Sequence, residues 1–136
     1  MAGRPVTQHR RRPLRRSRIR LARACGAGGR LRGLLCRARP PGRRTGLWFL
    51  PCRAVHTWGM RYAIDVAFID AWGRVLHIAR NVRPGRVAWC RRARSVIELA
   101  VNTVDSPLRY RRKLQAALHR SRAASPRIGT PSVRPP

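Results

Sequence analysis

Four side chains that could do chemistry lie within ten positions of one another. His56 supplies an imidazole, Thr57 a hydroxyl, Met60 a thioether and Asp65 a carboxylate. Asp65 is the only charge in an apolar run that follows at once, 64–69. A carboxylate inside such a run is costly unless a cation or hydrogen-bond donors satisfy it. We therefore expect Asp65 to have a partner, which belongs either to the framework of the fold or to a site.

Short segments with the pattern of β-strands surround these side chains. Each is apolar, and Gly or Pro turn signals separate most of them. Residues 70–73 end in Gly73, which can adopt the positive φ that a tight hairpin loop needs. We expect strands over 47–50, 54–58, 64–69, 74–79, 86–90 and 95–101. Strands this short and close together predict a mainly β fold, a small antiparallel β-sandwich or barrel.

A basic helix is expected after the last strand. Ser106-Pro107 is a helix-start signal, a capping residue followed by proline at the first helical position. Tyr110, Leu114 and Leu118 then form one apolar stripe, and basic residues occupy the other faces. The stripe either packs on the sheet, or the helix binds nucleic acid or an anionic membrane surface.

The rest of the chain completes a division into four regions. Leu31, Leu34 and Leu35 have helical spacing, which predicts a short N-terminal helical turn within 29–37. Both chain ends lack apolar periodicity and are rich in Arg and Pro, so we expect them to be disordered. The predicted regions are a disordered Arg-rich arm over 1–20, a β-rich domain over 21–105, a basic amphipathic helix over 106–120 and a disordered tail over 121–136.

The charge of the chain is strongly one-sided. It has 32 basic residues against four acidic ones, for a net charge of +28, and only Lys113 is a lysine. One explanation is an anionic partner, such as nucleic acid, a phospholipid surface or an acidic protein. The other is GC-rich codon usage, which favours Arg over Lys throughout a chain. The two explanations are compatible, because the electrostatic field exists whatever its origin.

The cysteines give no sign of a disulfide or zinc framework. They are widely spaced, without a Cys-x-x-Cys pair, which favours free thiols in a reducing compartment: Cys25, Cys36, Cys52 and Cys90. Cys52 and His56 are the one close pair of soft ligands, and zinc would need two more, from Cys36, His77 or Cys90. We expect no metal and no cofactor.

The N-terminus is basic but lacks the apolar segment of a secretion signal, and no run is long and apolar enough to span a membrane. We therefore expect a cytoplasmic protein, and a monomer.

An ordered series of motifs resembles the family catalogued as domain of unknown function 192, over about residues 21–105. The matching motifs are Arg32-Gly33-Leu34-Leu35, Gly46-Leu47-Trp48-Phe49-Leu50-Pro51-Cys52, His56-Thr57-x-x-Met60, Ile64-Asp65-Val66-Ala67-Phe68-Ile69-Asp70, Gly73-Arg74-Val75 and Val96-Ile97-Glu98-Leu99. The resemblance implies a compact β-sandwich or barrel from a family that is often bacterial or archaeal. It implies no reaction, because the family's biochemical role is not established.

The chain departs from the family after its last expected strand. Relatives follow that strand with a glycine turn and a short segment containing Gly-Asp, whereas 101–107 here contain neither. We expect the final strand to be missing or replaced by the basic helix, which would leave a sheet edge to be covered.

The resemblance also suggests a cleft, if the family's recurrent positions cluster. Arg32, His56, Thr57, Met60 and Asp65 would then line one ligand-binding site, with Arg32 as the counter-charge of Asp65. The alternative is a buried ion pair of purely structural role. A third possibility is catalysis by His56 oriented by Asp65, with Cys52 or Thr57 as nucleophile.

Three functions follow from these alternatives. The first is a non-enzymatic accessory or ligand-binding domain with a cleft around His56 and Asp65. The second is an anion-binding module that uses its Arg-rich arms on nucleic acid or a membrane surface. The third is a hydrolase-like enzyme, which the absence of paired carboxylates, a phosphate loop and a nucleophile elbow disfavours.

Overall fold

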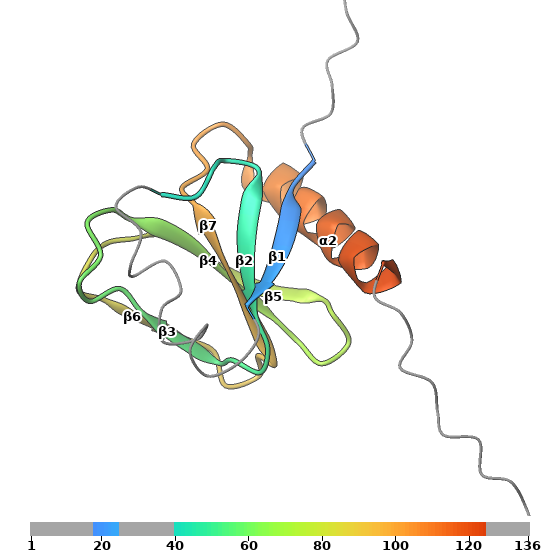
Figure 1. Ribbon diagram of the computed structural model, residues 1–136, viewed down its shortest axis with the longest axis horizontal. Helices are drawn as coiled ribbons and strands as arrows, with labels where there is room; N and C mark the ends of the chain where they lie inside the picture. Colours follow the sequence, from blue (N-terminus) through green and yellow to red (C-terminus); the bar gives the residue numbers. More distant parts are fainter. Residues whose placement is uncertain (1–17, 25–39, 125–136) are drawn as a thin grey trace, which may run out of the picture.

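The computed structural model describes residues 18–24 and 40–124, and its centre is an open sheet of five strands (Figure 1). Their order across the sheet is β1 (Arg20–Ala24), β2 (Thr45–Phe49), β7 (Ser95–Ala100), β4 (Ile64–Ile69) and β5 (Val75–Val82). A second sheet has two strands, β3 (Ala54–His56) and β6 (Val87–Trp89). The one described helix is α2 (Pro107–Ala123). The fold is therefore mainly β with a C-terminal helix.

The five-stranded sheet is mixed, so the expectation of a purely antiparallel sheet is wrong. Strand β1 runs parallel to β2, with Arg20 opposite Thr45 and Ala24 opposite Phe49. The remaining neighbours in the sheet pair antiparallel. The sequence did not reveal β1 because its five residues carry two arginines and no β-branched side chain. Ile19, just before β1, is buried, although it falls within the arm over 1–20 that was predicted to be disordered.

One face of the sheet is covered by α2. Tyr110, Leu114 and Leu118, the predicted apolar stripe, are all buried, and they pack in one cluster with inward-facing residues of the strands. Among those strand residues are Trp48 of β2 and Ile97 of β7. The helix therefore uses its stripe to pack on the sheet, which leaves its basic residues on the outer side.

The opposite face packs against the two-stranded sheet. Val55 of β3 and Ala88 of β6 belong to a second buried cluster, together with Val66 and Phe68 of β4. Because both faces of β4 are covered, every one of its residues is buried. This explains why its sequence is almost continuously apolar rather than alternating.

Most element positions match the expectations from sequence. The predicted strand over 64–69 coincides with β4, and the other predicted strands overlap β2, β3, β5, β6 and β7 within a few residues. The β4–β5 hairpin closes through Gly73, which has a φ of 82°. Helix α2 begins at Pro107 as predicted and ends three residues later than expected, at Ala123.

Some expectations lie outside the described residues. The helical turn within 29–37 and most of both arms are among them, and the sandwich or barrel arrangement stays a prediction. Within the described ranges, no helix combines the length and the apolar character that crossing a membrane requires.

Candidate functional site

Asp65 is fully buried, and its carboxylate is satisfied by three donors. Its Oδ2 accepts hydrogen bonds from Arg80 Nε at 3.1 Å and from the backbone N–H of Asn102 at 3.0 Å. Its Oδ1 accepts one from the backbone N–H of Asn81 at 2.9 Å. The expected partner Arg32 lies outside the described residues. The guanidinium that the structure places on Asp65 belongs to Arg80.

The same network continues into helix α2. The Asn102 side chain donates to Asp105 Oδ2 at 2.9 Å, and Lys113 Nζ donates to both oxygens of Asp105 at 2.7 Å. The Arg80 guanidinium also lies 4.9 Å from the ring centre of Tyr110. Burial raises the pKa of Tyr110, and the charge of Asp65 raises it further. This arrangement joins β4, β5, the connection after β7 and α2, which gives Asp65 a structural role.

Thr57 and Met60 are also structural. The Thr57 hydroxyl is buried, donates to the Arg83 carbonyl at 2.6 Å and accepts from the Arg86 amide at 2.9 Å. The Thr57 backbone adds two more hydrogen bonds to the β5–β6 turn. Met60 is buried in the cluster between the two sheets. Neither side chain is presented to a ligand.

His56 lies on a different side of the molecule from Asp65. On β3 it alternates with the buried Val55, so it points away from the five-stranded sheet and is exposed. On β4 Asp65 shares a face with Ala67 and Ile69, which pack under α2. The five-stranded sheet thus separates the two residues, and the structure does not bring the expected cleft together.

The arrangement for covalent catalysis is likewise not formed by the described residues. His56 has its ring 5.2 Å from that of Trp58, centre to centre, rather than beside a carboxylate. The Thr57 hydroxyl is engaged in the turn, and the Cys52 thiol donates to the Ala54 carbonyl at 3.2 Å. Within residues 18–24 and 40–124, no three or more His, Cys, Asp or Glu side chains gather as metal ligands would.

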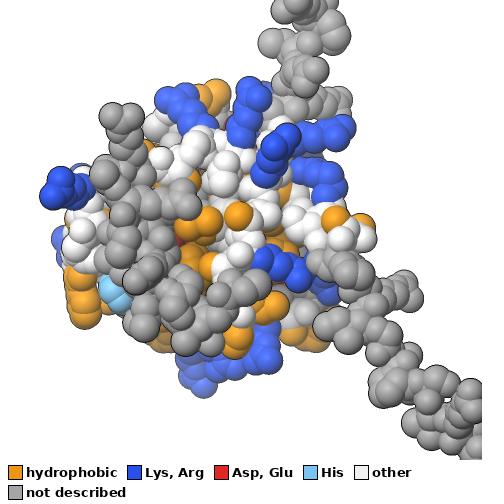
Figure 2. All heavy atoms as spheres, viewed as in Figure 1, with side chains coloured by type: hydrophobic (Ala, Val, Ile, Leu, Met, Phe, Trp, Pro, Cys, Tyr) orange, Lys and Arg blue, Asp and Glu red, His pale blue; other side chains and the backbone are white. Residues whose placement is uncertain are grey.

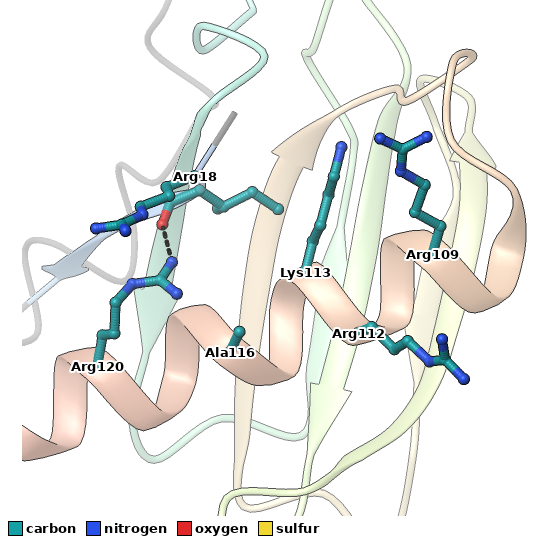
Figure 3. A pocket seen from close by; sticks show the side chains of 7 residues that line it. Arg18, Arg109, Arg112, Lys113, Ala116 and Arg120 are labelled. Atoms are coloured by element: carbon teal, nitrogen blue, oxygen red, sulfur yellow. Dashed lines mark hydrogen bonds between the residues drawn. The ribbon is translucent and has the colours of Figure 1, made fainter. Parts of the chain in front are cut away.

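A basic groove of about 600 Å³ runs along the outer side of α2, against the segment that leads into β1 (Figure 3). Five of its lining side chains are cations, and two small or apolar residues complete it: Arg18, Arg109, Arg112, Lys113 and Arg120, with Ile19 and Ala116. The four cations of α2 and Ala116 share one face because they recur at helical spacing. The hydrogen bond from Arg120 to the Ile19 carbonyl, at 3.2 Å, closes one end.

The cations of this groove are only partly neutralised. Asp105 binds Lys113 at 2.7 Å and Arg109 at 3.3 Å, and its side chain is 7% exposed. Hydrogen bonds from Lys113 and then Asn102 hold the pKa of Asp105 below its usual value, so it stays ionised. One carboxylate thus faces two of the five cations, and the groove keeps a positive surplus that an anion could satisfy.

The other three acidic side chains are also buried. Asp65, Asp70 and Glu98 are at most 8% exposed, and the chain has no acidic residue beyond these and Asp105. Arg74 bonds to Asp70 at 2.9 Å. Burial alone would raise the pKa of Asp70, but its hydrogen bonds and the charge of Arg74 lower it overall. In the view of Figure 2 blue side chains stand out all round the described surface, whereas red ones hardly show.

Comparison with known proteins identifies the family. The family model DUF192, described as "Uncharacterized ACR", matches residues 8–107. The chain belongs to DUF192. No curated protein matches it.

Two crystal structures share the fold of this DUF192 domain. One is a protein of unknown function from Novosphingobium aromaticivorans, 22% identical, with a TM-score of 0.55 over 62% of this chain and 64% of the other. The second, from Sinorhizobium meliloti, is described as a putative transcription regulator; it is 20% identical, with a TM-score of 0.53 over 60% of this chain and 67% of that one. This chain therefore spans less than two thirds of the Novosphingobium protein.

The groove of this DUF192 chain could be found only in part from its sequence. The cations of α2 stand at positions i, i+3, i+4 and i+11, a pattern that places them on one face. The sequence identified that helix as basic and amphipathic. The contribution of Arg18 and Ile19 was not visible, because it depends on β1 entering the sheet beside the helix.

Proposed function

We propose that this DUF192 domain is a non-enzymatic binding module whose ligand is nucleic acid, held through its phosphates in the groove along α2. The observation that carries the proposal is the set of five cations lining that groove, with one carboxylate beside them. A non-enzymatic binding domain was the first function predicted from the sequence. An anionic ligand, such as nucleic acid, belonged to the second. The site differs from both, because it is not a cleft around His56 and Asp65, and only Arg18 of its five cations comes from a predicted arm.

The shape of the groove suits an extended polyanion better than a single small anion. From Arg109 to Arg120 the helix rises about 16 Å, and basic side chains mark both ends of this distance. Ala116 lies between them and leaves the middle of the groove open, since it has no side chain beyond Cβ. A chain of phosphates could therefore run along the helix and meet several cations in succession.

Two of these cations are well placed to bind phosphate. Arg112 is exposed on α2, and Arg18 lines the groove from the segment before β1, where its guanidinium lies near that of Arg120 (Figure 3). Arginine presents several N–H donors in a fixed plane, which matches the oxygens of a phosphate. The putative transcription regulator with a similar fold supports nucleic acid as the partner, although that resemblance by itself concerns the fold.

The decisive test places a negative charge in the groove. Ala116→Glu adds a carboxylate between Arg112 and Arg120, each one helical turn away. Glutamate favours helix and would pair with these arginines, so α2 should stay folded. We expect the affinity of the full chain for a labelled DNA oligonucleotide to fall about tenfold or more, measured by fluorescence anisotropy at low salt.

Ala71→Glu is the matched control. It makes the same change at an exposed residue in the β4–β5 turn, which does not line the groove. We expect the control to lower affinity much less. Equal binding by Ala116→Glu and the control would place DNA binding elsewhere on the chain, and no binding by the unaltered protein would refute the function itself.

A further inference from the structure

The outer face of the small β3–β6 sheet is unusually aromatic for an exposed surface. Trp58 is 59% exposed and Trp89 is 65% exposed, and Val87 lies beside them at 55%. The register places Trp89 opposite Ala54 and Val87 opposite His56, so these side chains share the face that points away from the core. Figure 2 shows hydrophobic side chains next to a histidine at the left edge, where Figure 1 draws these strands.

The backbone beneath this face is held firmly. The Thr57 hydroxyl bonds to Arg83 and Arg86, which fixes the turn between β5 and β6 against the end of β3. Trp58 lies against this turn, 4.0 Å from where a Cβ on Gly85 would be. The Trp58 ring also lies near the His56 ring, with 5.2 Å between the ring centres. The buried Thr57 therefore fixes the backbone between the two exposed aromatic residues next to it, His56 and Trp58.

Arginines stand at both ends of this aromatic face. Arg83 and Arg86 are in the turn that Thr57 secures, at one end of the strand pair. At the other end the Cys90 amide donates to the Arg53 carbonyl at 2.9 Å, and Arg91 follows directly. All four are exposed, whereas Asp65, Asp70 and Glu98 are at most 8% exposed and contribute little to the described surface. Flat aromatic rings between cations are the elements that bind unpaired bases and their phosphates.

We propose that the outer face of β3–β6 binds single-stranded nucleic acid by stacking unpaired bases on Trp58 and Trp89. The bases stack on the aromatic surface, and the phosphates on either side of them bind the arginines at the ends of the strands. The inference rests on the proposed function for the class of ligand, but it assigns a second surface, which α2 does not contribute to. It also gives a preference that the groove alone cannot supply, for bases over bare sugar-phosphate.

A membrane surface fits this face less well. Among the described residues of β3 and β6, Val87 is the only large aliphatic side chain that is exposed, so there is little apolar surface to enter the acyl region. The guanidinium groups at both ends would have to stay hydrated while the rings between them left water. Stacking makes no such demand, because a nucleotide offers the flat π-face of its base to the ring and its phosphate to the arginine.

The test compares two ligands of equal charge. The full chain is titrated with oligothymidylate of about 16 nucleotides and with an abasic strand of the same length, and quenching of tryptophan fluorescence reports stacking. We expect the strand with bases to bind about tenfold or more tightly and to quench the fluorescence. In the double variant Trp58→Leu with Trp89→Leu the two strands should bind equally, at the affinity of the abasic strand.

Two further variants keep the result interpretable. Trp72→Leu is the matched control, because Trp72 is 72% exposed but lies in the β4–β5 turn, away from this face. Trp58→Phe with Trp89→Phe should restore part of the preference, since phenylalanine still stacks. Thermal unfolding of each variant checks that the fold is kept.

The outcomes separate this inference from the proposed function. Equal binding of both strands by the unaltered protein overturns the stacking site while leaving phosphate binding in the groove intact. A preference that survives the double variant, or that Trp72→Leu removes as well, also overturns it. If anionic phospholipid vesicles bind and lose affinity in the double variant, while the oligonucleotides do not, the face is a membrane surface instead. Failure of both strands to bind refutes the proposed function.

Discussion

The two sides of helix α2 use charge in opposite ways. On the inner side, Asp65 and Asp105 are buried or nearly so and receive hydrogen bonds from the backbone, from Asn102 and from basic side chains. On the outer side, cations line a groove and outnumber the carboxylates beside them. Asp65 and Asp105 are therefore part of the framework, and the groove keeps a surplus of positive charge that a ligand could meet.

This difference teaches how so basic a chain can both fold and bind. Its four acidic residues are too few to neutralise 32 basic ones, but Asp65 and Asp105 organise the connections between strands and helix, and Asp70 holds the β4–β5 turn. Withdrawing them also removes the groups that would repel a polyanion from the surface. The comparison makes a clear prediction: changes on the inner side should alter stability, and changes on the outer side should alter binding.

The largest effect on stability is expected from Asp65→Asn. The variant removes a buried negative charge and leaves Arg80 and two backbone amides facing a neutral side chain. We expect this to cost about 3 kcal/mol, the lower end of the range for breaking a buried ion pair, because the Arg80 side chain is 34% exposed. Chemical denaturation of the full chain should show this loss, while the folded fraction keeps its DNA affinity. An unchanged free energy of unfolding would contradict the structural role of Asp65.

A smaller and pH-dependent effect is expected at Asp105. Its pKa is lowered in the folded protein, so its ionised form stabilises the fold above its ordinary pKa of 3.8. That contribution is lost as the pH falls below this value and through the lower pKa of the folded state. Asp105→Asn should therefore unfold more easily than the unaltered chain near pH 6, by about 1–3 kcal/mol.

The same variant gives its own control as the pH is lowered. The difference in stability between Asp105→Asn and the unaltered protein should shrink on going from pH 6 to pH 2, as Asp105 becomes protonated. Some acid sensitivity should persist in the variant, since Asp70 also has a lowered pKa. A difference that stays constant over this range would mean that the ion pairs of Asp105 do not contribute to stability.

Much of the fold could be predicted from the sequence, because local signals agree with the tertiary structure. The strand pattern, the turn at Gly73 and the helix start at Pro107 depend on residues close together in the chain. Strand β1 could not be predicted, because its parallel pairing with β2 joins segments about 25 positions apart and its arginines weaken the strand pattern. Long-range pairing of this kind leaves little trace in a local window.

For the candidate site, the sequence could predict which kinds of interaction occur but not which residues come together. The sequence indicated that Asp65 needs donors, but the partner it named, Arg32, lies outside the described residues. The donors that the structure shows are Arg80 and the backbone amides of Asn81 and Asn102. The family resemblance suggested that His56 and Asp65 share a cleft, whereas the strands put them on opposite sides of the large sheet. The positive character of α2 was apparent, and the groove beside it required the position of Arg18.

The smallest effect is expected from Arg112→Gln, which tests whether the outer side of α2 binds a phosphate. Arg112→Gln removes one cation from the outer side of α2, where the side chain is exposed and the fold does not depend on it, so the free energy of unfolding should stay within about 0.5 kcal/mol. If Arg112 binds a phosphate, the slope of log affinity against log salt should become shallower by about 0.7–0.9. Arg92→Gln makes the same change in the turn before β7 and should leave the slope closer to that of the unaltered chain. Equal slopes for the two variants would mean that the chain attracts DNA through its overall charge, and the outer side of α2 would then differ from the inner side in exposure alone.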